Sequence, residues 1–128
     1  MYSVLIIDDD QAVRQSLVDY FEDYEWTIYE APSSEDALVL LQNTEIDSII
    51  VDLRLPGMGG PDFIRTLISQ GKYIPCLLCT GSPEYQLSED FIPIKTISNT
   101  LFHKPVVEIH LLEEELRSLI KFNKDSSK

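Results

Sequence analysis

The N-terminal sequence VLIIDDD, residues 4–10, places an apolar run of strand length directly before three consecutive aspartates. Two carboxylates about 4 Å apart repel by roughly 4 kcal/mol at an effective dielectric constant of about 20. A folded chain tolerates such a cluster where water screens it, where one group stays protonated, or where a cation lies between the groups. The remainder of the sequence has to decide among these three conditions.

Outward from this stretch, apolar runs of strand length alternate with segments that carry apolar residues at helical spacing. Helices are expected after each of the first three runs and at the end of the chain, with Asp10 and Ser33 as N-caps. Segment 82–99 contains two prolines and no clean helical stripe, so any helix there is expected to be short. The predicted strands are SVLIID (3–8), WTIYEA (26–31), DSIIVDL (47–53), IPCLLCT (74–80) and TLFH (100–103).

Strand–helix units with runs buried on both faces predict an α/β fold, in which a parallel sheet is covered by helices on each side. Ligand sites in such sheets lie beyond the carboxyl ends of the strands. Each polar residue at these ends has an ordinary structural explanation when it is taken alone. Together they form an unusual set of three acids, one hydroxyl and one ammonium: Asp8, Asp9, Asp52, Thr80 and Lys104.

This set of side chains suits one chemical task. Mg²⁺ prefers oxygen ligands and is held by one or two carboxylates while it keeps waters and phosphate oxygens. A carboxylate beside such an ion can act as a nucleophile on phosphorus. Phosphoryl transfer needs mainly positioning and neutralisation of the phosphoryl oxygens, which Lys104 and Thr80 could assist. A bound cation therefore explains why Asp8 and Asp9 stand together.

The motifs VLIIDDD, VDLRLPGMGG, CTG and KP resemble, in order and approximate spacing, the receiver domain of two-component response regulators, over residues 2–122. The resemblance implies a flavodoxin-like, three-layer fold with strand order 2-1-3-4-5. It implies that Asp52 is the phosphoacceptor, Thr80 the switch hydroxyl and Lys104 the ion-pair partner of the phosphoryl group. Mg²⁺ or Mn²⁺ would be bound by Asp8, Asp9, Asp52 and the backbone carbonyl of Arg54, and the Lys104–Pro105 bond is often cis in this family.

The same resemblance implies that the chain is a signalling domain and not an enzyme, apart from its own phosphotransfer and autodephosphorylation. Its partners would be a histidine kinase or phosphotransfer protein, and either a downstream protein or a C-terminal output domain absent from this chain. Two departures fall in the segment that reports phosphorylation. Leu101 stands where the family usually has an aromatic residue, and FIPIKTISN (91–99) replaces the usual small-residue turn before the fifth strand.

Composition narrows the class of protein further. Among 128 residues, 22 are acidic and 10 are basic, and the net charge of −12 argues against direct binding to nucleic acid or anionic membranes. No apolar stretch approaches the ~20 residues of a membrane span. Two cysteines make no disulfide framework, so the cytoplasm is the expected location. We expect one receiver domain over residues 1–122, and residues 123–128 as a tail or the start of a linker.

The residue pattern also admits other interpretations. A haloacid-dehalogenase-type phosphatase also forms an aspartyl phosphate, but it needs an acid two residues after the nucleophile, where this chain has Arg54. A pseudo-receiver, which binds partners without taking phosphate, is the other alternative. Cys76 and Cys79 lie at odd spacing in a predicted strand and should point to opposite faces, which disfavours a redox or zinc site. His103 and His110 lack metal-ligand spacing.

Overall fold

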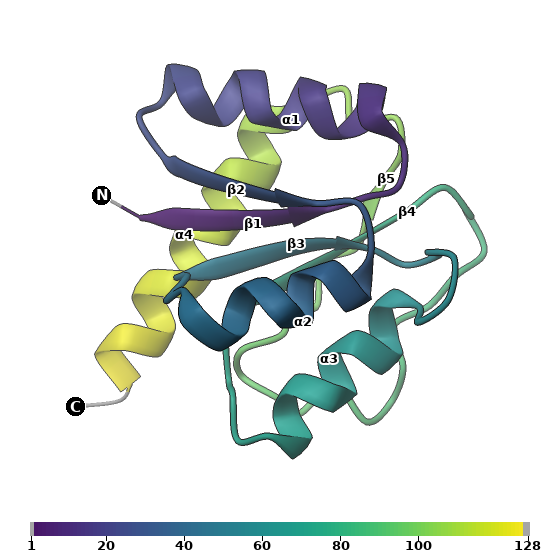
Figure 1. Ribbon diagram of the computed structural model, residues 1–128, viewed down its shortest axis with the longest axis vertical. Coiled ribbons are helices and arrows are strands. Elements are labelled where there is room, and N and C mark those ends of the chain that lie inside the picture. The colour runs from purple at the N-terminus through teal and green to yellow at the C-terminus, as the bar shows by residue number, and fades with distance from the viewer. Residues whose placement is uncertain (1, 127–128) are drawn as a thin grey trace.

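The computed structural model describes residues 2–126, and within them five strands form one parallel sheet in the order β2-β1-β3-β4-β5 (Figure 1). This confirms the predicted flavodoxin-like α/β fold. The strands are β1 (Ser3–Ile7), β2 (Thr27–Ala31), β3 (Ser48–Asp52), β4 (Cys76–Thr80) and β5 (Phe102–His103). The helices within the same residues are α1 (Gln11–Asp23), α2 (Ser34–Asn43), α3 (Gly60–Ser69) and α4 (Ile109–Ser126).

The central strands are uniformly buried because helices cover both faces of the sheet (Figure 1). One core packs α2 and α3 against the sheet around Phe63 and Leu5. The other packs α1 and α4 against the opposite face around Phe21 and Leu116. The alternation of side chains along a strand explains how one sheet serves both cores.

The two cysteines show this alternation directly. Cys76 belongs to the core beneath α2 and α3, whereas Cys79 belongs to the core beneath α1 and α4. Both are free thiols, and burial raises the pKa of each to about 12. The structure therefore confirms that the two thiols point to opposite faces, and it gives neither one the low pKa of a reactive cysteine.

The helix starts follow local capping chemistry. The Asp10 carboxylate accepts hydrogen bonds from the backbone N–H groups of Ala12 and Val13, and Ser33 Oγ accepts one from Asp36 N. These bonds satisfy N–H groups that have no partner inside the helix. Both predicted N-caps are confirmed. The Asp10 cap lies just beyond Asp8 and Asp9, which follow β1. It therefore fixes the direction in which the chain continues from these two aspartates into α1.

Segment 82–99 has turns and bends but no α-helix, which agrees with the sequence prediction. It is nevertheless anchored at several points. Phe91 is fully buried in the core beneath α2 and α3. A parallel bridge joins Ile97 to Cys76, in which Cys76 N donates to Thr96 O at 2.7 Å and Ser98 N donates to Cys76 O at 2.9 Å. The bridge makes the end of this segment an extension of the sheet edge.

The last helix extends beyond its predicted end. Helix α4 continues through Ser126, so residues 123–126 of the predicted tail or start of a linker are helical, and residues 127–128 lie outside the described part of the chain. Asn123 Nδ2 donates to Leu119 O and to Lys95 O, which ties the last turns to segment 82–99. Among residues 2–126, no helix has the length and apolar character required to cross a bilayer.

Candidate functional site

The carboxyl ends of β1, β3 and β5 bring four of the predicted site residues together at one edge of the sheet. Asp8 and Asp9 follow β1, Asp52 ends β3, and Lys104 follows β5. One carboxylate oxygen from each of Asp8, Asp9 and Asp52 lies within 4.8 Å of the others. The parallel register produces this grouping, because β1 and β3 are neighbours and both end at the same edge.

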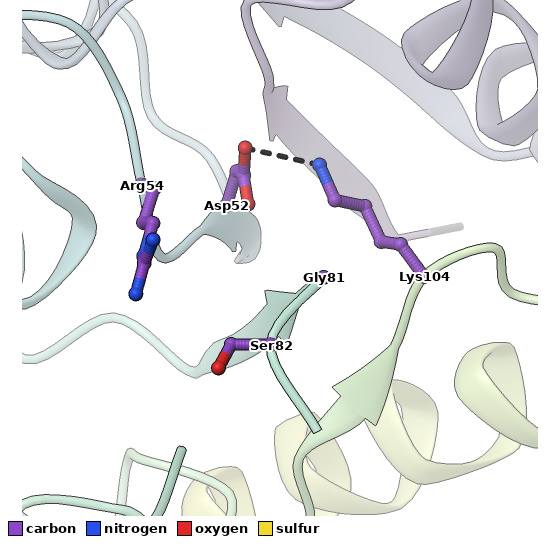
Figure 2. A pocket seen from close by; sticks show the side chains of 5 residues that line it. All are labelled: Asp52, Arg54, Gly81, Ser82 and Lys104. Carbon is purple, nitrogen blue, oxygen red and sulfur yellow. Dashed lines mark ion pairs between the residues drawn. The ribbon is translucent and has the colours of Figure 1, made fainter. Parts of the chain in front are cut away.

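Lys104 provides the counter-charge for this cluster. Its Nζ lies 3.1 Å from Asp8 Oδ2 and 3.0 Å from Asp52 Oδ2, the second of which is drawn in Figure 2. The side chains of Asp8 and Asp52 are only 4% and 6% exposed, so both charges need a partner. Three carboxylates and one ammonium leave the cluster with a formal charge of −2. The ammonium alone therefore does not neutralise the site.

The protonation equilibria respond to this arrangement. Burial raises the pKa of Asp52, and the charge of Asp8 adds to that effect, while hydrogen bonds from Lys104 and from the Arg54 backbone oppose it. Partial burial disfavours the charged form of Lys104, but its bonds to Asp52 and Asp8 outweigh this and raise its pKa. The ammonium therefore stays charged at neutral pH.

Asp8 is held from two sides. Asp10 N donates to Asp8 Oδ1 at 2.9 Å, and Arg14 Nη1 on α1 donates to the Asp8 backbone carbonyl at 2.7 Å. Arg14 is itself paired with Glu30 on β2 at 3.0 Å. Sequence reasoning missed Arg14, since only the fold brings α1, β1 and β2 together at this point. Its position one turn into the helix after the aspartates was the available signal.

Thr80 lies at the end of β4, almost fully buried, and is paired with His103 of β5. Its Oγ1 accepts a hydrogen bond from Ser82 N at 3.0 Å, and its carbonyl accepts one from Lys104 N at 2.8 Å. The structure thus places Thr80 beside the site with its hydroxyl engaged by its own turn. An open pocket of about 450 Å³ adjoins it, lined by Asp52, Arg54, Gly81, Ser82 and Lys104 (Figure 2).

The loop between β3 and α3 approaches Asp52 very closely. A Cβ atom on Gly60 would lie 2.4 Å from the Asp52 carbonyl oxygen, a distance that no ordinary side chain allows. Gly60 N also donates to Leu53 O at 3.0 Å. Only glycine permits this packing of the first turn of α3 against the backbone of the acidic residue. Gly60 belongs to the motif VDLRLPGMGG, but the motif alone does not indicate this role.

Glu35 on α2 supports the same loop from the other side. Its Oε2 accepts a hydrogen bond from Met58 N at 3.1 Å. Gly57, with a φ of 75°, packs directly against this carboxylate. Glycine adopts this left-handed conformation without steric cost. The loop that follows Asp52 is therefore fixed by one side-chain acceptor and by two glycines.

The donor set fits a hard divalent cation. Three carboxylates converge within 4.8 Å, their formal charge exceeds that of Lys104, and the adjoining pocket opens to solvent. Such oxygen ligands with room for water are what Mg²⁺ requires. The carboxylates of Asp8, Asp9 and Asp52 are therefore suited to hold the ion, and the fit rests on the chemistry of these groups.

This fold and this acidic edge define a class, the phosphoacceptor signalling domains with a flavodoxin-like sheet. The chain belongs to the response regulator receiver domain family, whose sequence profile matches residues 4–115. It is 34% identical over 83 residues to the two-component response regulator PhoP of Pseudomonas aeruginosa, which covers 65% of this chain and 37% of PhoP. It is also 34% identical over 108 residues to the probable transcriptional regulator ycf29 of Cyanophora paradoxa, covering 82% of this chain and 50% of that protein.

Solved structures support the same fold. The signal receiver domain of an HD domain-containing protein from Pseudomonas fluorescens superimposes with a TM-score of 0.83 at 26% identity, covering 97% of this chain and 98% of that one. A Francisella response regulator receiver domain gives a TM-score of 0.80 at 24% identity, covering 96% and 99%. This chain spans nearly the whole of these two solved receiver domains, but only about a third to a half of the length of the curated relatives.

Proposed function

We propose that Asp52 accepts a phosphoryl group from the phosphohistidine of a histidine kinase or phosphotransfer protein. A carboxylate oxygen of Asp52 attacks phosphorus, the bond to the histidine nitrogen breaks, and an acyl phosphate forms. The observation that carries this proposal is the position of Asp52, which lines an open pocket while its neighbour Asp8 lies outside the pocket lining. Asp52 is thus the buried acid that a substrate can reach.

The neighbouring side chains have separate tasks in this proposal. Lys104 now bridges Asp8 and Asp52, and its ammonium would pair with the phosphoryl oxygens once Asp52 is phosphorylated. Thr80 would turn its hydroxyl from Ser82 N toward the new group. This exchange of hydrogen-bond partners supplies the two-state packing event that a switch needs.

Asp8, Asp9, Asp52 and the backbone carbonyl of Arg54 would hold Mg²⁺ or Mn²⁺ in this function. The bound ion would supply charge neutralisation at the phosphoryl oxygens. The residual charge of −2 on the cluster supports this assignment, because a divalent cation brings it to neutrality.

The phosphoryl donor and the output belong to the same proposal. A receiver domain implies a histidine kinase upstream, and either a downstream protein partner or a C-terminal output domain absent from this chain would carry the output. Two free, buried cysteines favour a reducing compartment such as the cytoplasm. We place the receiver unit at residues 1–122, although helix α4 continues to Ser126.

Incubation with acetyl phosphate and Mg²⁺ tests the proposal. We expect the intact protein to gain one phosphate by mass, and we expect EDTA or Asp52→Asn to abolish the gain. Asp19→Asn, at an exposed acid on α1, is the matched control and should label fully. Full labelling of the Asp52→Asn protein would show that the acceptor is another residue. No labelling of the wild type would favour a pseudo-receiver. A panel of histidine kinases from the source organism then identifies the donor.

A further inference from the structure

A second pocket, of about 440 Å³, lies at the opposite edge of the sheet from the acidic site. Tyr2 and Trp26 directly precede β1 and β2, and Tyr24 follows the end of α1, so these residues gather at the amino ends of the strands. Helix α4 closes the pocket with Glu113 and Arg117. The proposed phosphorylation function uses none of these five residues.

Glu113 is a buried carboxylate within this pocket, only 6% exposed. The Trp26 indole Nε1–H donates to its Oε2 at 3.0 Å, and Arg117 Nη2 lies 3.2 Å from its Oε1. A buried charge needs a cationic partner, and an indole N–H is neutral. That partner here is the guanidinium of Arg117, which is 51% exposed. The carboxylate is fixed in the protein, whereas its cation lies in contact with water.

Three aromatic side chains, those of Tyr2, Tyr24 and Trp26, line the same pocket as this carboxylate. The ring centroids of Tyr2 and Trp26 are 5.7 Å apart, and those of Tyr20 and Tyr24 are 4.7 Å apart. Desolvation, together with Tyr24 and the negative charge of Glu113, raises the pKa of Tyr20 to about 12. Aromatic side chains that line a pocket together with a desolvated carboxylate favour a cation there, through the ring quadrupole and through the negative charge.

We propose that this pocket is a binding site for a guanidinium cation, which takes the place of Arg117 at Glu113. The exchange is feasible because Arg117 is half-exposed and can leave, while the incoming cation keeps the buried carboxylate of Glu113 paired. A planar guanidinium also donates to a carboxylate while it stacks on an aromatic ring, which an ammonium does not do equally well. The net charge of −12 further favours the approach of a cation.

Trp26 makes the test direct, because it is the only tryptophan in the chain and it lies in the pocket. Titration with arginine amide should change its fluorescence saturably. Citrulline amide has nearly the same shape without the side-chain charge and should give no change. Lysine amide carries the same charge as arginine amide and should bind at least several-fold more weakly. Equal effects of arginine amide and lysine amide, or a non-saturable effect, would overturn the proposal.

Variants separate binding from a purely structural role of the Glu113–Arg117 pair. Arg117→Ala removes the internal competitor and should bind arginine amide up to about fivefold more tightly. Its melting temperature should also recover on addition of arginine amide, whereas Arg65→Ala, which breaks an exposed pair with Asp90, should show no such recovery. Glu113→Gln keeps an acceptor for the indole and should lose binding at least tenfold. Unchanged affinity in Glu113→Gln would refute the assignment.

The same titration identifies the source of the guanidinium. An acetylated and amidated Gly-Arg-Gly tripeptide presents the group as a partner protein would. Tighter binding of the tripeptide than of arginine amide would assign the site to an arginine side chain of a partner. Equal or weaker binding of the tripeptide would assign it to a free guanidinium compound.

Discussion

Replacement of Lys104 by methionine should leave the carboxylates of Asp8 and Asp52 without the cation that now lies 3.1 and 3.0 Å from them. Removal of one partner from a buried ion pair costs about 3–5 kcal/mol. The Lys104 side chain is 18% exposed and the pocket is open, so we expect the low end of that range, about 3 kcal/mol. Methionine keeps most of the apolar stem, which confines the effect to charge. Such a loss is a large fraction of the stability of a typical domain.

Urea unfolding in EDTA and in Mg²⁺ measures this prediction. In EDTA the variant should lose about 3 kcal/mol, and Lys121→Met, at an exposed lysine on α4, should change stability by less than about 0.5 kcal/mol. Mg²⁺ should stabilise the variant more than the wild type, because the uncompensated site attracts the ion more strongly. A Lys104→Met protein as stable as the wild type in EDTA would refute the idea that Lys104 neutralises this cluster.

The pH dependence of the same variant has a defined sign. The hydrogen bond from Lys104 lowers the pKa of Asp52, so its removal raises that pKa further above the unfolded value. A raised folded-state pKa adds stability below the unfolded pKa, and this contribution is lost as pH rises through the folded pKa. The deficit of the variant in EDTA should therefore shrink on acidification from pH 7.5 to pH 5.5. A deficit that grows on acidification would contradict this account.

Three further predictions concern other parts of the site and its surroundings. Gly60→Ala forces a Cβ to within 2.4 Å of a backbone oxygen, so it should lower the free energy of unfolding by about 1–3 kcal/mol and slow labelling by acetyl phosphate. Gly81→Ala has open space at its Cβ and should unfold at the same urea concentration as the wild type. The Arg65 guanidinium lowers the pKa of Asp90 to about 2. The contribution of this pair to stability is therefore present above the unfolded pKa and is lost as pH falls through about 2. An NMR titration of the Asp90 carboxyl group with a midpoint near the ordinary value would contradict the pairing. Asp9→Asn should weaken Mg²⁺ binding in calorimetry. Its metal-free melting temperature should stay equal or rise, since Asp9 is exposed among like charges. A clear drop in that melting temperature would show a structural role for Asp9.

The sequence predicted the sheet and the membership of the acidic edge because both depend on local order. Each strand ends where an apolar run meets a polar residue, and parallel strands bring those ends together. Caps such as Asp10 and Ser33 act within three residues and were equally readable. These features need no knowledge of distant contacts.

Features that depend on contacts between distant segments were not predictable from the pattern. Lys104 bridges Asp8 across 96 positions, and Trp26 donates to Glu113 across 87. The orientation of the Thr80 hydroxyl depends on a turn N–H two residues later, which competes with any bond toward Asp52. In each case the chemical type of the residue is evident from the sequence, whereas its partner depends on the three-dimensional structure.

Segment 82–99 combines both situations. Its prolines exclude a regular helix, which the sequence indicated, yet its attachments come from elsewhere in the fold. Arg65 on α3 donates to both carboxylate oxygens of Asp90 at 3.0 and 3.1 Å and to Ser88 Oγ at 3.0 Å, and its guanidinium lies 4.8 Å from the centroid of the Phe91 ring. Ser88 Oγ also donates to Asp90. Beyond Phe91 the segment is joined to the sheet at Cys76 and to α4 through Ser98 and Glu115.

These attachments divide the segment into two parts with different expected stability. Residues 83–90 include no buried residue and most of them are exposed, whereas residues 91–98 contain the buried Phe91 and the bridge to Cys76. Regions with few buried contacts open at low free energy. We therefore expect fast hydrogen exchange over residues 83–90 without phosphate and slow exchange at Ser98. Phe91→Ala should cost about 3–5 kcal/mol and extend fast exchange through residue 97.

Activation should act on the first part of the segment through its attachment to Thr80. If Thr80 turns toward a phosphoryl group on Asp52, the hydrogen bond that its hydroxyl accepts from Ser82 N must break, and that bond lies at the start of the segment. The freed backbone then has to find a new partner, so the segment reorders from its N-terminal end. Exchange measured with and without beryllofluoride should show slowing over residues 83–90 and little change at Ser98. Strong protection of residues 83–90 in both states would show that this part is already rigid, and the change at Thr80 would then have to be transmitted through β5 instead.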